Sequence, residues 1–179
     1  MTGGGKSSQS IDAAVAILRD NRLASLATTG LDGWPHCTMV GIANEGLRIY
    51  FVVSRTSQKL ANIEQDDRVA LAIGRDVIEP SSIRALSVAA RASEIGDDDE
   101  RLSAVRLLLA KRPALNRLEK PHLEQSAVMV AVPEVIRLLD YSKGYGHSVL
   151  LKLAADGQLA DLEEQQHDWG YGEAFKPVT

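Results

Sequence analysis

Three short apolar segments separated by two glycine-containing turns constrain the fold of this chain more than any other feature. The segments, at 23–29, 35–43 and 47–53, are rich in β-branched, aromatic or alternating apolar residues, which favour strands. The turns between them contain Gly30, Gly33 and Gly46, and glycine adopts the positive φ that tight turns often require. The pattern therefore predicts two successive hairpins, which together form an antiparallel meander.

The remaining segments predict a mainly β protein with peripheral helices. Ser10 has the side chain of a helix N-cap, and Pro133 indicates a strand edge or a bulge. We expect helices at 11–21, 57–65, 98–111 and 113–120, and strands at 68–74, 83–95, 128–140 and 147–153. Strands joined mostly as hairpins, with helices inserted, are typical of an antiparallel barrel.

The organisation along the chain predicts one domain, because no internal repeat or long linker interrupts the pattern. Its 179 residues, 45% of them hydrophobic, are enough for a sizeable core. We place that domain at 10–155, after a disordered Gly/Ser-rich lead at 1–9 and before a polar C-terminal tail at 156–179.

Composition excludes several classes of function. The net charge is −4 and the basic residues are scattered, which argues against nucleic acid as a partner. The single cysteine, Cys37, excludes an intrachain disulfide framework and a cysteine-rich zinc site, and is typical of a reducing cytoplasm. The N-terminus lacks the apolar core of a signal peptide, and no segment approaches the length of a membrane span.

The loop at 54–59, with the sequence Ser-Arg-Thr-Ser-Gln-Lys, is the clearest candidate for a binding site. It connects the third predicted strand to a helix that begins at Ser57. A helix N-terminus has free N–H groups and a positive dipole end. Hydroxyls and cations placed there predict a site for a phosphate or another anion.

An ordered set of short motifs resembles the pyridoxamine 5'-phosphate oxidase-like family of FMN-binding split β-barrels. The motifs are LATT at 26–29, DGWPH at 32–36, IYFVV at 49–53, SQKLANI at 57–63 and DDRVAL at 66–71. The resemblance implies a six-stranded antiparallel split barrel. It also implies a homodimer with FMN at the subunit interface, each site being built from both chains.

The resemblance also implies which residues bind the cofactor. Ser57 and Lys59 match the family's phosphate-binding loop, with Arg55 as a helper, and Gln58 stands where the true oxidases have an arginine. The other positions line the ring and ribityl chain or lie near the site: Thr38, Met39 and Val40 with their main-chain groups, Val52 and Val53 on the next strand, and Arg84 at the start of the fifth strand.

The sequence departs from the true oxidases at the positions that bind pyridoxamine phosphate. Thr38 replaces an arginine, Ala43 replaces a lysine, and the segment at 169–172 does not reproduce the substrate-binding arginine motif. We therefore expect an FMN-dependent oxidoreductase acting on another small molecule, with NAD(P)H as a candidate electron donor. The alternatives are a non-catalytic or haem-handling binding protein on the same barrel, and an F420-dependent reductase.

Four further features have simpler interpretations. His147 follows a Gly-Tyr-Gly turn that weakly resembles a loop of haem-utilisation proteins, but a structural histidine is the favoured interpretation. Cys37 is expected to be buried and inert. The acidic run at 97–100 is typical of a helix start rather than a metal site. The segment containing His167 and Trp169 is either a cover for the flavin or partner, or a loose terminus.

Overall fold

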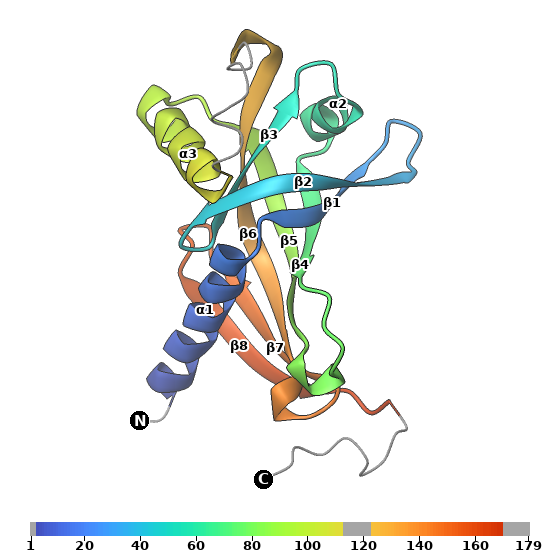
Figure 1. The fold of residues 1–179 in the computed structure, drawn as a ribbon, viewed down its shortest axis with the longest axis vertical. Helices are drawn as coiled ribbons and strands as arrows, with labels where there is room; N and C mark the ends of the chain where they lie inside the picture. Colours follow the sequence, from blue (N-terminus) through green and yellow to red (C-terminus); the bar gives the residue numbers. More distant parts are fainter. Residues whose placement is uncertain (1–2, 113–122, 170–179) are drawn as a thin grey trace.

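The computed structural model describes residues 3–112 and 123–169, and Figure 1 shows how their helices and strands are arranged. The three α-helices are α1 (Gly3–Asp20), α2 (Gln58–Gln65) and α3 (Asp98–Lys111). The eight strands are β1 (Leu23–Thr29), β2 (Pro35–Glu45), β3 (Arg48–Ser54), β4 (Arg68–Gly74), β5 (Arg84–Glu94), β6 (Ser126–Asp140), β7 (His147–Leu153) and β8 (Leu159–Gln166). The described residues also form the short 3₁₀ turns η1 (Pro80–Ser82), η3 (Leu123–Gln125) and η4 (Tyr141–Lys143).

Six of the strands form a closed antiparallel barrel, which confirms the predicted fold class. They follow one another in the order β3-β2-β1-β4-β5-β6, and β6 pairs back with β3 to close the barrel. The two predicted hairpins are present, with positive φ at Gly33 and Gly46. The predicted helix at 113–120 lies outside the described residues.

Strand β6 changes its partner partway along its length, and Pro133 lies at the change. Residues 126–131 pair with β3, whereas residues 135–139 pair with β7. Between them the register with β5 shifts at Ala89/Ala90. Proline has no N–H for the ladder, and a bulge bends the strand locally. The predicted bulge is therefore confirmed, and it lets β7 and β8 continue the sheet beyond the barrel.

Inward-facing side chains of the strands fill the barrel, and the helices pack additional side chains against it. Ile49, Phe51 and Val53 of β3 point into the main core, and Leu60 and Ile63 of α2 pack against the same cluster. Helix α1 adds further buried side chains at helical spacing, namely Ala14, Ile17 and Leu18. On the outer side of β3 and β6, helix α3 packs over a second cluster that contains Tyr50, Val128 and Val130.

The first helix is longer than expected, because it begins at Gly3 and not at Ile11. The predicted disordered lead is therefore wrong for residues 3–9. Glycine is a poor helix former, so local propensity predicts a later start. In the folded chain Lys6 forms an ion pair with Glu164 of β8, at 3.4 Å, and Ser10 is buried in the helix interior rather than capping its end.

The C-terminal region contains a strand that the sequence pattern did not predict. Residues 159–166 form β8, an edge strand paired with β7, so the expected tail is wrong for this segment. Its larger apolar residues, Leu159 and Leu162, do not alternate with period two, and residues 163–166 are all polar. Backbone pairing and cross-strand contacts, including the ion pair of Lys152 with Asp161 at 2.9 Å, hold it on the sheet.

Candidate functional site

Helix α2 begins at the end of β3, and its first turn is capped locally. Ser57 is the N-cap, and its Oγ accepts a hydrogen bond from the N–H of Leu60 at 3.4 Å. The Ser57 N–H donates to the carbonyl of Ser54 at 3.0 Å, which sets the turn between strand and helix. The predicted helix is thus confirmed, and the positive end of a helix of eight residues lies at this loop.

The loop also presents several hydroxyls, and one cation that has no partner among the described residues. The hydroxyls of Ser54 and Thr56 lie 3.1 Å apart on the exposed surface. Lys59, in the first turn of α2, is half-buried and has no hydrogen bond or ion pair to any residue that the structure describes. A lysine is a flexible point cation with three donors. This end of α2 can therefore accept an anion.

Arg55 has a different environment, because a carboxylate of β5 already binds it. Its Nη1 and Nη2 donate to Glu94 at 3.2 and 2.6 Å. These hydrogen bonds raise the pKa of Arg55 above its ordinary value. Glu94 was not singled out by sequence reasoning, since the pair joins positions far apart in the chain. Arg55 can thus bind an anionic ligand only in competition with Glu94.

A buried amide anchors α2 to the barrel. Asn62 is fully buried, its Nδ2 donates to Thr28 Oγ1 of β1 at 2.9 Å, and its Oδ1 accepts from Gln58 at 2.8 Å. Gln58, predicted to contact the cofactor, is therefore held by Asn62. The available sequence signal for Asn62 is an amide between Leu60 and Ile63, on the apolar side of a short helix.

The predicted ring-lining residues are divided between the two faces of the barrel wall. Met39 and Val52 lie on the outer face and are 58% and 41% exposed. Val40 and Val53 point into the core, so only their main-chain groups can meet a ligand on the outer surface. Thr38 points inward beside them, and its Oγ1 is buried without a partner among the described residues.

A polar recess lies beside α2, between that helix and the β1–β2 turn. It has a volume of about 580 Å³, and its walls include Trp34, His36, Gln58 and Asn62. His36 Nδ1 is a second buried polar atom without a partner in the described part of the chain. His36 and Thr38 lie on the same face of β2, two residues apart. Unsatisfied hydrogen-bonding capacity therefore gathers at the end of the barrel where α2 begins.

Arg84 is not part of this group. It begins β5, whereas Glu94, the partner of Arg55, ends the same strand. A strand of this length spans about 30 Å. The start of β5 and the N-terminus of α2 therefore lie at opposite ends of the barrel (Figure 1). Arg84 instead contacts Asp140 at 3.5 Å and Ser142 at 3.4 Å.

Three residues outside the proposed FMN site, Cys37, His147 and Asp97, have clear positions in the structure. Cys37 is exposed on the outer face of β2, so the expectation that it is buried is wrong. Alternation fixes which residues share its face, but not which face the core covers. His147 is buried, and its Nε2 lies 2.8 Å from Glu164. Asp97 caps α3 by accepting from the Glu100 N–H at 2.8 Å, which confirms the helix-start interpretation.

Trp169 packs against the turn that precedes β7. Its ring makes an edge contact with Tyr145, with centroids 5.7 Å apart, and Tyr145 in turn contacts Tyr141 at 4.9 Å. A Cβ at Gly146 would lie 2.8 Å from the indole, so only glycine allows this approach. Within the described residues Trp169 therefore contacts its own chain, with 56% of its surface exposed.

A match to a family model identifies the protein family to which this chain is related. The model of pyridoxamine 5'-phosphate oxidase matches residues 10–140, which include the whole barrel. The chain belongs to the pyridoxamine 5'-phosphate oxidase-like family. None of the curated proteins matches it significantly.

Solved structures show how widely this family's barrel is used. A haem-binding protein from Mycobacterium smegmatis matches with a TM-score of 0.68 and 22% identity, over 79% of this chain and 57% of that protein. General stress protein 26 from Bacillus anthracis has a TM-score of 0.60 and 21% identity, over 74% of this chain and 95% of that one. An F420 reductase has a TM-score of 0.55 and 24% identity, over 68% of this chain and 93% of that one. At these identities the likeness establishes the fold alone. This chain spans little more than half of the haem-binding protein's length.

Residues 3–112 and 123–169 contain neither a helix that could span a membrane nor a cluster of metal ligands. No helix among them has both the length and the apolar character to span a membrane. They also contain no group of three or more histidine, cysteine or carboxylate side chains arranged to hold a metal ion.

Proposed function

We propose that this protein is an FMN-dependent oxidoreductase that binds the cofactor non-covalently, with the phosphate at the N-terminus of α2. The substrate is a small molecule other than pyridoxamine phosphate. The exposed thiol of Cys37 supports a reducing compartment, and we place the protein in the cytoplasm.

Lys59 is the observation that carries the proposal. It is the cation of the 54–59 loop that lacks a carboxylate partner among the described residues, because Arg55 is bound by Glu94. It also occupies the position that matches the family's phosphate-binding lysine. A cation without a partner, beside a helix N-terminus and three hydroxyls, is suited to a phosphate dianion. The residues present therefore fit the phosphate end of FMN.

The neighbouring surface fits the ring end. Met39 and Val52 offer exposed apolar side chains on the outer faces of adjacent strands, on which a flat ring can be buried. Thr38 and Val40 point inward from β2, so they can meet this ring only through their main-chain groups. When bound, FMN would supply the electron-transfer chemistry, while the protein binds it, orients it and tunes its surroundings.

We also propose that two copies associate, through the outer face of β1, β4 and β5. The register places six small uncharged residues there in two rows across the strands: Ser25, Ala72 and Ser87 in one, and Ala27, Ala70 and Ala89 in the other. Helices α1 and α2 pack on the core cluster and α3 packs on the outer side of β3 and β6. A flat face of small side chains lets two sheets approach closely, which supports a second copy as its partner.

The first experiment is an absorbance spectrum of the purified protein, followed by FMN titration of the wild type and Lys59→Ala. Losing a charge-assisted hydrogen bond to phosphate is expected to raise the Kd about tenfold or more. The matched control is Lys152→Ala, which removes an exposed lysine on β7 that pairs with Asp161. Equal FMN affinity in the wild type and Lys59→Ala would contradict the assigned phosphate site.

The same protein sample tests whether NAD(P)H reduces the bound flavin and whether F420 or haem binds in place of FMN. Bleaching of bound flavin by NAD(P)H would support an oxidoreductase with that donor. Tight binding of F420 or haem, without FMN binding, would replace the cofactor. For haem, His147 is an unfavourable ligand because it is buried and its Nε2 already contacts Glu164. A Soret band that survives in His147→Ala would therefore indicate a different ligand.

A further inference from the structure

A second cavity lies at the end of the barrel opposite to α2. It has a volume of about 500 Å³ and lies between α1, the β4–β5 connection and the turn after β6. Its lining combines an apolar wall with several charged side chains. None of its residues belongs to the 54–59 loop, and Arg84 is the one residue in it that the family resemblance had assigned to FMN.

The apolar wall is the inner face of α1 together with the end of β6. Ala13, Ala16 and Ile17 line it from the helix, and Leu138 lines it from the strand. Ala13, Ala16 and Ile17 recur at three- and four-residue spacing, so they form one helix face. Small residues at 13 and 16 keep the space open. The wall therefore accepts an apolar body of moderate size.

The charged residues of the cavity are predominantly basic. Arg75, Arg84 and Lys143 face two carboxylates, those of Asp20 and Asp140. Asp20 pairs with Arg19, at 3.1 Å, which partly neutralises it. The excess of positive charge favours an anionic ligand.

Arg84 is oriented, but its donors are not all used. Its Nε lies 3.5 Å from Asp140 Oδ1, and its Nη2 donates to Ser142 Oγ at 3.4 Å. Asp140 Oδ1 also accepts from the Ser142 hydroxyl at 2.6 Å, so its charge is shared. A guanidinium has five donors in a planar fork that suits a carboxylate or phosphate. Lys143 lies next to Ser142, on the turn after β6, and has no partner among the described residues.

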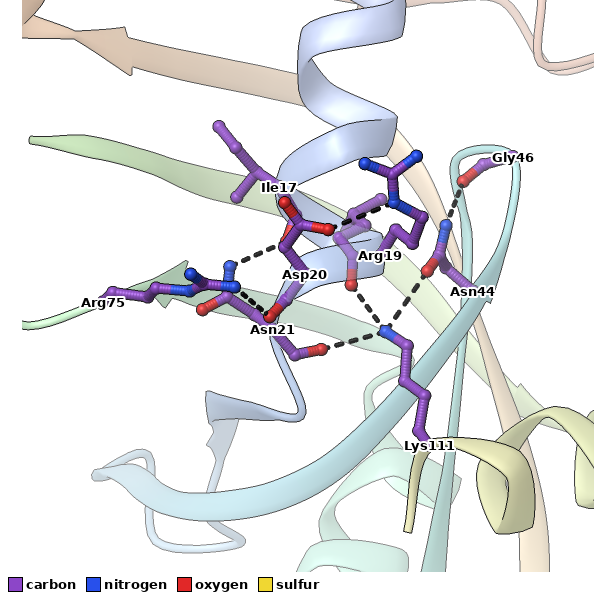
Figure 2. A network of polar contacts seen from close by, with 9 residues as sticks. Ile17, Arg19, Asp20, Asn21, Asn44, Gly46, Arg75 and Lys111 are labelled. Atoms are coloured by element: carbon purple, nitrogen blue, oxygen red, sulfur yellow. Dashed lines mark hydrogen bonds and ion pairs between the residues drawn. The ribbon is translucent and has the colours of Figure 1, made fainter. Parts of the chain in front are cut away.

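Arg75 holds the other end of the cavity in place. Its Nη2 donates to the carbonyl of Asp20 at 2.7 Å, at the C-terminus of α1. Figure 2 shows Arg75 reaching from its loop to this helix end, beside Asn21. The contact fixes the apolar wall relative to the β4–β5 connection. The cavity is therefore a built feature of the fold and not a gap between loose segments.

We propose that this cavity binds a small amphipathic organic anion, with its carboxylate or phosphate on Arg84 and Lys143 and its apolar body against Ala13, Ala16 and Leu138. This assigns Arg84 to a second site, separate within the chain from the α2 N-terminus. The proposal does not depend on FMN binding.

Isothermal titration calorimetry with 2-naphthoate tests the proposal on the full chain. One saturable site is expected, with an affinity at least tenfold above that of the neutral isostere 2-naphthamide. Inorganic phosphate alone is expected to compete weakly, because it leaves the apolar wall uncovered. Equal affinity for the neutral isostere, or full competition by phosphate at the same concentration, would overturn the assigned ligand class.

Two variants locate the site. The double variant Arg84→Ala/Lys143→Ala is expected to weaken 2-naphthoate binding at least tenfold, and Ala16→Phe is expected to abolish it by filling the cavity with both cations present. Lys152→Ala and Lys59→Ala, combined in one double variant that also removes two positive charges, serve as the charge-matched control outside the cavity. Unchanged binding in the double variant would place the ligand elsewhere. An FMN titration in parallel separates the two proposals, since that binding depends on Lys59 and this one on Arg84.

Discussion

At the scale of single residues, the carboxylates and carbonyls around each basic side chain decide what it is available to do. Arg55 and Lys59 belong to one loop, yet Glu94 binds the first and none of the described residues binds the second. Asp66 and Arg68, between α2 and β4, are the most complete pair of this kind. Arg68 donates to both oxygens of Asp66, at 2.9 and 2.7 Å, and its main-chain N–H adds a third bond at 3.1 Å.

The Asp66–Arg68 contact predicts a specific acid dependence. The hydrogen bonds from the Arg68 side chain, followed by that from its main chain, lower the pKa of Asp66 to about 2 from an ordinary value of 3.8. A depressed carboxyl pKa contributes stability that is present above the unfolded value and is lost as the pH falls through the folded one. We expect this contribution to disappear between about pH 4 and pH 2.

Carboxyl-carbon NMR titration of the wild type and Arg68→Ala measures the effect directly. The titration midpoint of Asp66 is expected to return toward its ordinary value in the variant. Asp161, whose pKa is lowered by Lys152, serves as an internal control that should not move. An Asp66 midpoint that is the same in both proteins would show that Arg68 does not stabilise the carboxylate.

At the scale of the elements, the C-terminus of α1 is held by cations from two other segments. Lys111, in the last turn of α3, donates to the carbonyls of Leu18 and Asn21 at 2.6 and 2.9 Å, and lies 3.4 Å from Asn44 Oδ1 of β2 (Figure 2). The end carbonyls of a helix lack intrahelical partners and carry the negative end of its dipole. One ammonium thus joins α1, α3 and β2, and its burial lowers the pKa of Lys111.

Lys111→Met is expected to reduce the free energy of unfolding by about 2 kcal/mol, because it removes hydrogen bonds from a charged donor to half-buried acceptors while keeping a similar length of apolar chain. Urea denaturation measures the loss. The matched control is Lys152→Met, whose partner Asp161 is exposed, and which is expected to cost much less than Lys111→Met. Equal losses in the two variants would show that the helix-end contacts contribute no more than a surface ion pair.

At the scale of the whole molecule, one side of the barrel has no covering helix among residues 3–112 and 123–169. The outer rows of β1, β4 and β5 carry alanine and serine, and Ala70, Ala72 and Ala89 are exposed there. Arg91 and Arg68 are opposite each other at one end of the face, where each is paired with a carboxylate. The middle of the face is therefore uncharged, which suits a contact between two copies.

Ala70→Glu is expected to shift the proposed dimer to monomer, because it would place two buried carboxylates near the centre of the contact. Light scattering at micromolar concentration measures the mass with and without FMN. Ala155→Glu, the same substitution on the exposed β7–β8 turn, is expected to leave the assembly unchanged. A wild type that is monomeric under both conditions would exclude this face as a stable interface.

Local patterns in the sequence determined most of the elements. The bounds predicted for β1, β4, β7 and α3 are those of the structure. Each rests on interactions between near neighbours, such as alternation along a strand or the cap that Asp97 supplies to α3. The ordered motifs between 26 and 71 also predicted the barrel and the family.

Only the tertiary structure decided the features that depend on residues distant in the chain. It placed β8 on the sheet, extended α1 to Gly3, bound Arg55 to Glu94, and put Arg84 in a cavity at the other end of the barrel. It also turned Cys37 outward. Strand alternation specifies which side chains share a face, and a helix start specifies where an anion can bind. Contacts that form only when the barrel closes decide which strand face the core covers. They also decide which cations are paired with a carboxylate and which can bind a ligand.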